Sequence, residues 1–462
     1  MPPVVLESTS DQFSPSTPTG SAYRNFVNPE WARLLSLLGM EIKYRRCLGT
    51  ELHTEDGRTI LDFLSGYCVH NTGHNHPYIV EALIHELQAS GPIMLQSHIA
   101  YTAGTLAERL TALTGPHLTK TFFCSSGSEG IESVIKFARV FTGRNGIVYA
   151  KGAFHGLTCG ALSLMGDGFW KDGFGPMLPE TYEVPFGDIA ALEATLQQNK
   201  IAAIVLEPLQ GEAGIVPAPA GYLAAVERLC KKHGTLFVLD EVQTGIARTG
   251  TFIAGQRDNV QPDMVVLAKA LSGGLVPVAA VLMRDDIYRA VYGSLKKSII
   301  HTSTYSENGL SMRAGLATLD VVESESLAPR AEALGAELRT QLTQRLSRFE
   351  MFSEVRGLGL LNGIVMQPPT SLRLRIPFQT FRTIHPAMFG QILVMRLFQH
   401  HNILSQMCGN NFMVLKVAPP LVITEGQIAQ YLDAIEAVME TVHSSSSFWS
   451  DALHLAQRAV RV

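Results

Sequence analysis

Five short apolar runs, rich in β-branched residues, lie between residues 121 and 283 and constrain the fold more than any other feature. Continuous apolar runs of this length are typical of strands that are covered on both faces. An amphipathic segment after the second run ends at Gly234, behind two lysines and a histidine, as a helix C-terminus does. Repeated strand–helix–strand units predict an α/β fold with a mainly parallel sheet flanked by helices. The runs are residues 121–124, 201–207, 235–240, 263–268 and 278–283.

Polar residues follow four of these predicted strands at the point where each strand ends. A Ser-Gly loop at 125–128 follows the first run, Glu207 and Asp240 end the second and third, and Lys269 follows the fourth. Ligands of open α/β sheets bind at the carboxyl ends of the strands. The sequence therefore predicts one rim with a phosphate-binding type of loop, two carboxylates and a lysine.

Each of these features also has a plainer structural explanation. Serine and glycine at a helix start most often serve as caps, although free N–H groups there also suit a phosphate. Lys269 could be a desolvated nucleophile, but a lone lysine at a strand end more commonly extends its amine into solvent. Asp240 could pair with a cationic ring nitrogen, cap the next helix, or bind a metal together with Glu241. His74 and His76 have the spacing of a metal pair but no further ligands nearby, so a structural role is the commoner outcome.

Composition excludes several classes of partner. The chain has 462 residues, of which 46% are hydrophobic and 17% charged, and its net charge is −4. This balance gives no electrostatic reason to expect nucleic acid or an anionic membrane. No apolar stretch is long enough for a membrane span, and no strand–GxGxxG–helix unit predicts a dinucleotide. Six scattered cysteines and a start without signal-peptide order predict a reduced, cytoplasmic protein.

The two flanks of the apolar runs have a different pattern. Asp56-Gly57 lies in an alternating segment and predicts a hairpin, and long helical patterns surround a Gly-rich stretch after residue 321. These flanks are predicted to fold together as a smaller α+β domain. The predicted division is a loose leader at 1–22, the small domain at 23–71 and 321–442, the large domain at 72–320, and a tail at 443–462.

Several longer segments occur in an order that resembles one enzyme family. The segments are GHNHP, SSGSEGIESVIKFAR, FHG, EPLQGEAG, LDEVQTGIARTG, LAKALSGG, HTSTY and APPLVI. Over roughly residues 30 to 440 the chain is similar to class III (ω-) aminotransferases, which have the type I fold of pyridoxal-phosphate enzymes. The resemblance implies pyridoxal 5′-phosphate as cofactor, and ping-pong transfer of an amino group from an amine donor to an oxo acceptor.

The resemblance also implies roles for individual residues at the cofactor. Lys269 would hold it as a Schiff base and later move a proton between substrate and cofactor. Asp240 would pair with the pyridine nitrogen, Gln243 with the phenolic oxygen, and Phe154 would stack on the ring. The further cofactor contacts implied are Ser126, Gly127 and Ser128 at the phosphate, and His155 and Glu207 beside the ring.

Other implied roles concern the partner subunit and the substrate. Thr304, with Ser303, would reach the phosphate in a neighbouring subunit, which implies a homodimer with shared active sites. Tyr67 would line the substrate channel, and Glu212 matches a carboxylate that gates the pocket in ornithine-type members. Lys416 is the third residue assigned to substrate binding.

Two positions depart from the family pattern. Lys416 stands where members that use glutamate commonly have an arginine, and Leu157 stands where ornithine-type members often have one. A lysine offers a point charge instead of the two parallel hydrogen bonds of a guanidinium. We therefore expect at least one substrate to be a terminal amine or aldehyde, with a long or apolar chain as one possibility.

Two alternatives remain open from the sequence. A decarboxylase, racemase or aminomutase of the same fold would share Lys269 and Asp240, and product analysis would distinguish them. A non-catalytic binding protein on the same scaffold would lack the visible absorption band of a lysine-bound cofactor.

Overall fold

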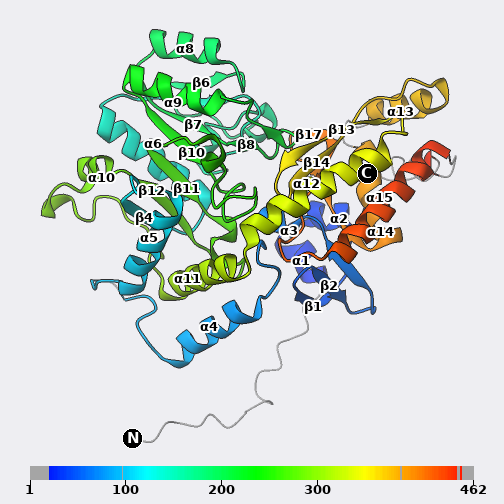
Figure 1. Cartoon of the computed structure of the whole chain (residues 1–462), viewed down its shortest axis with the longest axis horizontal. Coiled ribbons are helices and arrows are strands. Elements are labelled where there is room, and N and C mark those ends of the chain that lie inside the picture. Colours follow the sequence, from blue (N-terminus) through cyan, green and yellow to red (C-terminus); the bar gives the residue numbers. More distant parts are fainter. Residues whose placement is uncertain (1–19, 96, 385–387, 445–447, 450–462) are drawn as a thin grey trace, which may run out of the picture.

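The computed structural model describes residues 20–95, 97–384, 388–444 and 448–449 (Figure 1). Residues 1–19 of the predicted leader 1–22, and residues 445–447 and 450–462 of the predicted tail, lie outside these residues, whereas residues 20–22 belong to a helix. Within the described ranges no helix combines the length and the apolar character that crossing a membrane requires.

A seven-stranded sheet with the order β4-β12-β11-β10-β7-β5-β6 forms the centre of the larger part of the molecule. All of its strands point the same way except β12, which runs antiparallel to β11 and β4. The five predicted strands and the mainly parallel sheet are confirmed, whereas β5 and β6 were not predicted. The bounds are β4 Lys120–Cys124, β5 Gly146–Ala150, β6 Thr181–Val184, β7 Ile201–Leu206, β10 Leu236–Asp240, β11 Met264–Leu267 and β12 Ala279–Met283.

Helices cover both faces of this sheet, which explains why its strands are apolar throughout. Val238 of β10 packs in one buried cluster with α6 and α10, while Leu239 packs in another with α5, α8, α9 and α11. Neighbouring residues of a strand point to opposite faces, so both faces are core. The bounds are α5 Tyr101–Thr114, α6 Gly127–Thr142, α8 Ile189–Gln198, α9 Tyr222–His233, α10 Asp285–Tyr292 and α11 Gly309–Ser324.

Two four-stranded sheets lie outside the large sheet, and one of them combines segments from both ends of the chain. One has the order β1-β2-β3-β15, and β15 joins β3 in parallel with Ile403 opposite Leu61. The predicted hairpin turn at Asp56-Gly57 joins β2 to β3 and is confirmed. The other sheet has the order β13-β14-β17-β16. The bounds are β1 Tyr44–Leu48, β2 Glu51–Thr54, β3 Thr59–Asp62, β13 Phe352–Leu358, β14 Leu361–Met366, β15 Ile403–Leu404, β16 Gln406–Cys408 and β17 Asn411–Val417.

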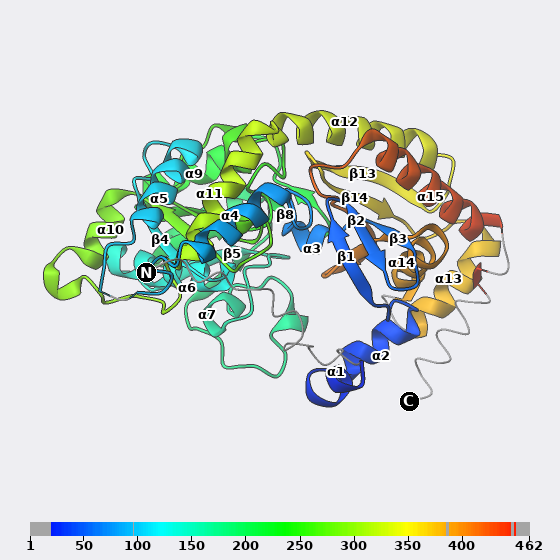
Figure 2. The ribbon, with the colours of Figure 1, turned by 90° about the horizontal axis from the view of Figure 1, so that it is seen from below.

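Both views place the blue N-terminal strands beside the orange and red C-terminal elements, away from the large sheet (Figures 1 and 2). The exact division into two domains stays a prediction. The helices of this part are α1 Gly20–Phe26, α2 Pro29–Leu37, α3 Ser65–Cys68, α13 Leu372–Ile384, α14 Met388–His401 and α15 Glu425–Ser444. The long helix α12 (Leu327–Leu346) runs from α11 toward α15 (Figure 2).

Arg248 connects the two parts of the molecule through hydrogen bonds in the interior. Its guanidinium is fully buried and donates to Asn71 Oδ1, Ser65 Oγ and the carbonyl oxygens of Leu360 and Pro419. These partners belong to the N-terminal segment, the β13–β14 turn and the segment after β17. One buried side chain therefore satisfies acceptors from three distant stretches of the chain.

Candidate active site

A cavity of about 940 Å³ opens at the carboxyl ends of β4, β7, β10 and β11. Because β12 lies between β4 and β11 and runs antiparallel to both, these four strands end at the same edge of the sheet. Eleven of the predicted site residues line this cavity: Tyr67, Ser126, Gly127, Ser128, Phe154, His155, Glu207, Glu212, Asp240, Gln243 and Lys269. Lys416, Ser303 and Thr304 are not among the lining residues.

The N-terminus of α6 forms one wall of the cavity. Ser126 caps the helix by accepting a hydrogen bond from Glu129 N, and Glu129 Oε2 accepts one from Ser125 N in return. Gly127 lies against Val242, where an added Cβ would approach Val242 Cγ2 to 2.9 Å. The first N–H groups of a helix have no partner within the helix and carry the positive end of its dipole. This wall is therefore suited to a phosphate.

Asp240 and His155 form a buried pair beneath the cavity. Asp240 Oδ2 lies 2.7 Å from His155 Nδ1, and Asp240 Oδ1 accepts a hydrogen bond from Val242 N. Burial disfavours a charged imidazole, but the hydrogen bond and negative charge of Asp240 outweigh it and raise the pKa of His155. The pair places a carboxylate with a histidine behind it at the cavity wall, where it could face a cationic N–H.

Glu207 follows β7, the strand that pairs with β10, and fixes the backbone of the cavity wall there. Its carboxylate accepts hydrogen bonds from Phe154 N at 2.9 Å and Gly211 N at 3.2 Å. Burial raises the pKa of Glu207 to about 7. The Phe154 ring meets Trp170 edge to face, with their centroids 5.3 Å apart. A backbone hydrogen bond and a ring contact therefore both fix the position of Phe154.

Lys269 begins a short 3₁₀ turn, separated from the end of β11 only by Ala268, and has a left-handed backbone with φ of 46°. A non-glycine residue in this region is uncommon and is retained where the surrounding structure over-determines it. The side chain lines the cavity together with Asp240 and Gln243. The turn therefore directs the lysine into the cavity at the end of its strand.

Lys416 is fully buried beside the cavity instead of lining it. Its Nζ lies 2.5 Å from Glu212 Oε1 and 4.9 Å from the centroid of the Tyr67 ring. Glu212 Oε2 also accepts a hydrogen bond from Gly409 N. Burial alone would raise the pKa of Glu212, but Lys416 lowers it, and Glu212 in turn raises the pKa of Lys416. The two charges therefore neutralise each other beside the cavity.

The side chains considered as metal ligands, Glu241, His74 and His76, bind other protein groups in the structure. Glu241 accepts hydrogen bonds from Thr244 Oγ1 and from the backbone N–H groups of Ala254 and Gly255. His74 lies 2.7 Å from Asp62, and His76 lies 2.9 Å from Glu325. Among the residues that the structure describes, no three histidine, cysteine or acidic side chains are grouped as metal ligands.

Several apolar residues at the mouth of the cavity were not predicted. Trp31 and Leu34 come from α2, Phe169 and Trp170 come from a 3₁₀ turn at Gly168–Trp170, and Phe412 comes from β17. None of these residues belongs to a recognisable sequence motif. The local signals that exist are helix-start patterns, Asn28-Pro29 before Trp31 and Asp167 before Phe169.

Comparison with known proteins places the chain among aminotransferase sequences and structures. Residues 38–439 match the family model described as aminotransferase class-III. The aminotransferase PigE of a Serratia species is 33% identical over 90% of this chain, which spans 53% of that protein. A putrescine aminotransferase of Pectobacterium atrosepticum is 34% identical over 92% of this chain and 89% of its own length. The structure of ornithine aminotransferase from Toxoplasma gondii superposes with a TM-score of 0.79 at 27% identity, covering 92% of this chain and 96% of that one.

Proposed function

Because the chain belongs to the class-III aminotransferases, which use pyridoxal phosphate, we propose that it transfers the amino group of a terminal amine, with Lys269 as the catalytic residue. The observation that carries the proposal is the single cavity at which Lys269, Asp240 and the start of α6 meet. In the overall reaction the donor amine becomes a carbonyl compound, and the oxo acceptor becomes an amine.

The residues of the cavity fit the cofactor in three respects. The N–H groups of Gly127 and Ser128 at the helix start suit its phosphate, and the close approach of Gly127 to Val242 leaves no room there for a Cβ. Asp240 supplies a buried carboxylate for a protonated ring nitrogen, and the Phe154 ring supplies an apolar face. When bound, pyridoxal phosphate supplies an aldehyde carbon for amines and a ring that accepts electrons.

The chain's own residues then have distinct roles. Lys269 would hold the cofactor covalently, and its amine, once displaced by the substrate, would take the proton from the donor carbon. Asp240 would keep the ring nitrogen protonated, with His155 fixing the orientation of its carboxylate. Gln243 would reach the phenolic oxygen, while Glu207 holds the backbone of Phe154 in place.

The preference for a terminal amine follows from the charges at the cavity. No arginine is among the described residues that line it, and Lys416 is already paired with Glu212. A substrate α-carboxylate would therefore meet no unpaired guanidinium of this subunit, whereas an amine would meet carboxylates. A relative that is named a putrescine aminotransferase supports the same class of donor.

We also propose a cytoplasmic homodimer. A hydrogen bond from Gly309 N to Ile93 O joins one segment, of which residues 93–95 and 97–101 are described, to a second segment, 295–309. Both expose large apolar side chains, which favours association with a second copy. Ser303 and Thr304 lie in the second segment, where a neighbouring subunit's phosphate could be reached. Sedimentation analysis that gives only monomers would contradict this proposal.

Visible absorption of the purified holoenzyme tests the catalytic assignment. We expect Lys269→Ala to lose the band of the lysine-bound cofactor and to lower turnover by about 10²–10⁴-fold or more, since general acid–base catalysis contributes that much. Lys200→Ala, an exposed lysine away from the cavity, serves as the control. Normal turnover in Lys269→Ala would refute the assignment.

A further inference from the structure

The mouth of the active-site cavity is apolar, in contrast to the polar rim beneath it. Four large apolar side chains line the mouth while remaining 40% to 76% exposed, namely Trp31, Leu34, Leu157 and Phe169. Exposed apolar side chains that converge on one opening mark a binding surface more often than a solvated one. We refer to these four residues as the apolar collar.

The α2 side of the collar is fixed by a helix start. The Asn28 side chain caps α2 by accepting a hydrogen bond from Trp31 N at 3.0 Å, and Pro29 occupies the first turn. Leu34 follows Trp31 by three residues and therefore lies on the same face of the helix. The cap thus determines which side chains α2 presents to the cavity.

A second capped turn fixes another part of the collar. The Asp167 side chain accepts a hydrogen bond from Phe169 N at 2.9 Å. The ring of Phe169 meets Trp170 edge to face at 5.2 Å. Trp170 Nε1 donates to Asn410 Oδ1 at 2.7 Å, which holds that indole in place.

An aromatic row therefore leads from the depth of the cavity to its mouth. Trp170 meets Phe154, which we placed on the cofactor face, and Phe169 beyond it is 76% exposed. A chain that extends outward from the reacting carbon would lie along this row. The row offers such a chain no cationic partner, because the lining among the described residues has one lysine, Lys269, and no arginine. The carboxylate of Glu212, which also lines the cavity, is already paired with Lys416.

We propose that the apolar collar binds the hydrocarbon chain of a primary alkylamine and of the aldehyde that this amine becomes. The inference rests on the proposed aminotransferase function and specifies its donor. The alkylamine gives up its amino group and becomes the aldehyde of the same chain, while the oxo acceptor takes up that group. Electrons and atoms balance between the two substrates, so the reaction needs no further oxidant.

The test is a half-reaction series with the holoenzyme, followed by the change in its visible absorption. The donors are butylamine, hexylamine and octylamine, with putrescine and ornithine for comparison. We expect kcat/KM to rise by up to about fourfold for each added methylene that the collar buries. Putrescine should react less efficiently than hexylamine, because its second ammonium group would lose hydration against an apolar surface.

Substitutions in one loop separate the collar from general effects on the fold. Phe169→Ser should lower kcat/KM for octylamine at least tenfold, by removing roughly two methylenes' worth of contact, and leave butylamine nearly unchanged. Phe174→Ser is the matched control, because Phe174 lies in the same loop, is 72% exposed and does not line the cavity. This variant should behave like the unmodified enzyme with every donor.

Three other results would overturn a claim: the first two concern the apolar collar, and the third concerns the proposed function. Rates that are independent of chain length, or higher with ornithine than with octylamine, would overturn the apolar collar and leave the aminotransferase function standing. An equal loss for butylamine and octylamine in Phe169→Ser would also overturn it, since that indicates a structural role. No absorption change with any donor, in protein that retains its cofactor, would overturn the proposed function itself.

Discussion

Lys416 carries a positive charge at a position that is fully buried, and Glu212 is its counter-ion. Removing two charges from water costs several kcal/mol per ion, and their attraction returns that cost only while both are present. A buried ion pair therefore adds little net stability, but the loss of one partner leaves the other charge uncompensated. At this site the pair also removes a basic group from the substrate cavity.

A double-mutant cycle tests this interpretation. We expect Glu212→Gln and Lys416→Met each to lower the free energy of unfolding by about 3–5 kcal/mol. The double variant should recover most of that loss, because neither charge then remains unpaired. Denaturant titration of all four proteins measures the coupling. Additive losses in the double variant would mean that the two residues act independently.

Glu207 makes the stability of the protein depend on pH. Burial raises its pKa from 4.5 to about 7, so the unfolded chain releases this proton at a lower pH than the folded protein does. The stabilisation by the protonated carboxyl is complete below pH 4.5 and is lost as the pH rises through about 7. Within that window the free energy of unfolding should fall by about 1.4 kcal/mol per pH unit on account of this group.

Glu207→Gln should flatten that dependence, because the amide does not titrate. The measurement compares the slopes of unfolding free energy against pH for the two proteins, so any constant loss from the substitution cancels. An equal slope in both proteins would assign the pH dependence to other groups.

Single residues were predictable where they follow a recognisable strand. Asp240 and Lys269 end or follow apolar runs, and the direction of parallel strands then brings them to one edge. The burial of Lys416 was not predictable, since its partner lies 204 residues away in sequence. Trp31 and Phe169 were missed for the same reason. Each follows a helix cap that the sequence indicates, but only the tertiary fold brings the two side chains to one cavity opening.

At the scale of elements, two serines at the start of α6 have different structural roles. Ser126 caps the helix, whereas the Ser128 hydroxyl accepts a hydrogen bond from Leu157 N.

Ser126→Ala should lower the free energy of unfolding by about 1 kcal/mol, as loss of an N-cap does. Ser128→Ala should have a smaller effect on unfolding of the cofactor-free protein, yet weaken cofactor binding. Thermal unfolding and cofactor titration of both variants distinguish the two; the reverse pattern would exchange the assigned roles.

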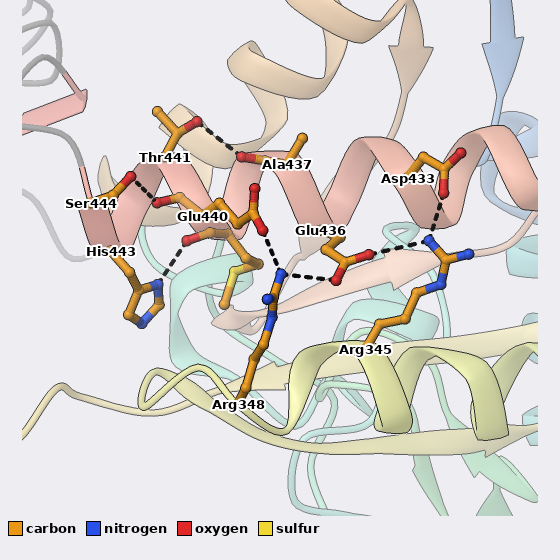
Figure 3. A network of polar contacts seen from close by, with 10 residues as sticks. Arg345, Arg348, Asp433, Glu436, Ala437, Glu440, Thr441, His443 and Ser444 are labelled. Atoms are coloured by element: carbon orange, nitrogen blue, oxygen red, sulfur yellow. Dashed lines mark hydrogen bonds and ion pairs between the residues drawn. The ribbon is translucent and has the colours of Figure 1, made fainter.

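Charged side chains connect α12 and α15 along their exposed sides (Figure 3). Arg345 pairs with Asp433 and Glu436, and Arg348 pairs with Glu436 and Glu440. Exposed ion pairs contribute 0–1 kcal/mol, because water screens them and ordering the side chains costs entropy. The apolar faces of the two helices, including Leu342 and Ile435, supply the main contact instead.

Arg348→Ala should therefore change the free energy of unfolding by less than about 1 kcal/mol, and by still less at high salt. Leu342→Ala, on the buried face of the same helix, should cost about 2–5 kcal/mol. Denaturation at low and high ionic strength measures both. A larger loss for Arg348→Ala than for Leu342→Ala would reverse this ranking.

Elements were predictable where apolar periodicity was strong, as in the five central strands and in α9. The hairpin β13–β14 lies in a stretch that the sequence indicated only as Gly-rich. Its glycines obscure the alternation of apolar residues. Gly357 and Gly359 have positive φ, and an added Cβ at Gly359 would come within 2.7 Å of the backbone of residues 248–250. That requirement is tertiary and leaves no periodic signal in the sequence.

For the whole molecule, Arg248 is a buried side chain that hydrogen-bonds the two parts to each other. Arg248→Met would leave Asn71 Oδ1 and the carbonyl oxygens of Leu360 and Pro419 without their donor. Each buried acceptor without a partner costs about 1–3 kcal/mol, so the total loss should be several kcal/mol. Denaturant unfolding measures it, with the exposed Arg375→Met as control. A loss no greater than in the control would show that Arg248 is not needed to join the two parts.

The sequence predicted that segments from the two chain ends associate, but it did not predict how their strands pair. The flanking segments shared an α+β pattern, which indicated that they fold together, but the sequence did not specify which strands meet. β15 has only two residues, too short for a periodic signal, and its position beside β3 depends on α14 packing across the sheet.

The pairing of Ile403 with Leu61 has a consequence for biosynthesis. Strand β3 leaves the ribosome early, yet its neighbour β15 is translated about 340 residues later. At about 5–20 residues per second, this interval lasts roughly 20–70 seconds. Throughout that time the nascent chain exposes an incomplete sheet with a free edge, which is the kind of surface that chaperones shield. Cellular yield is therefore expected to depend on protection during translation as well as on the stability of the finished protein.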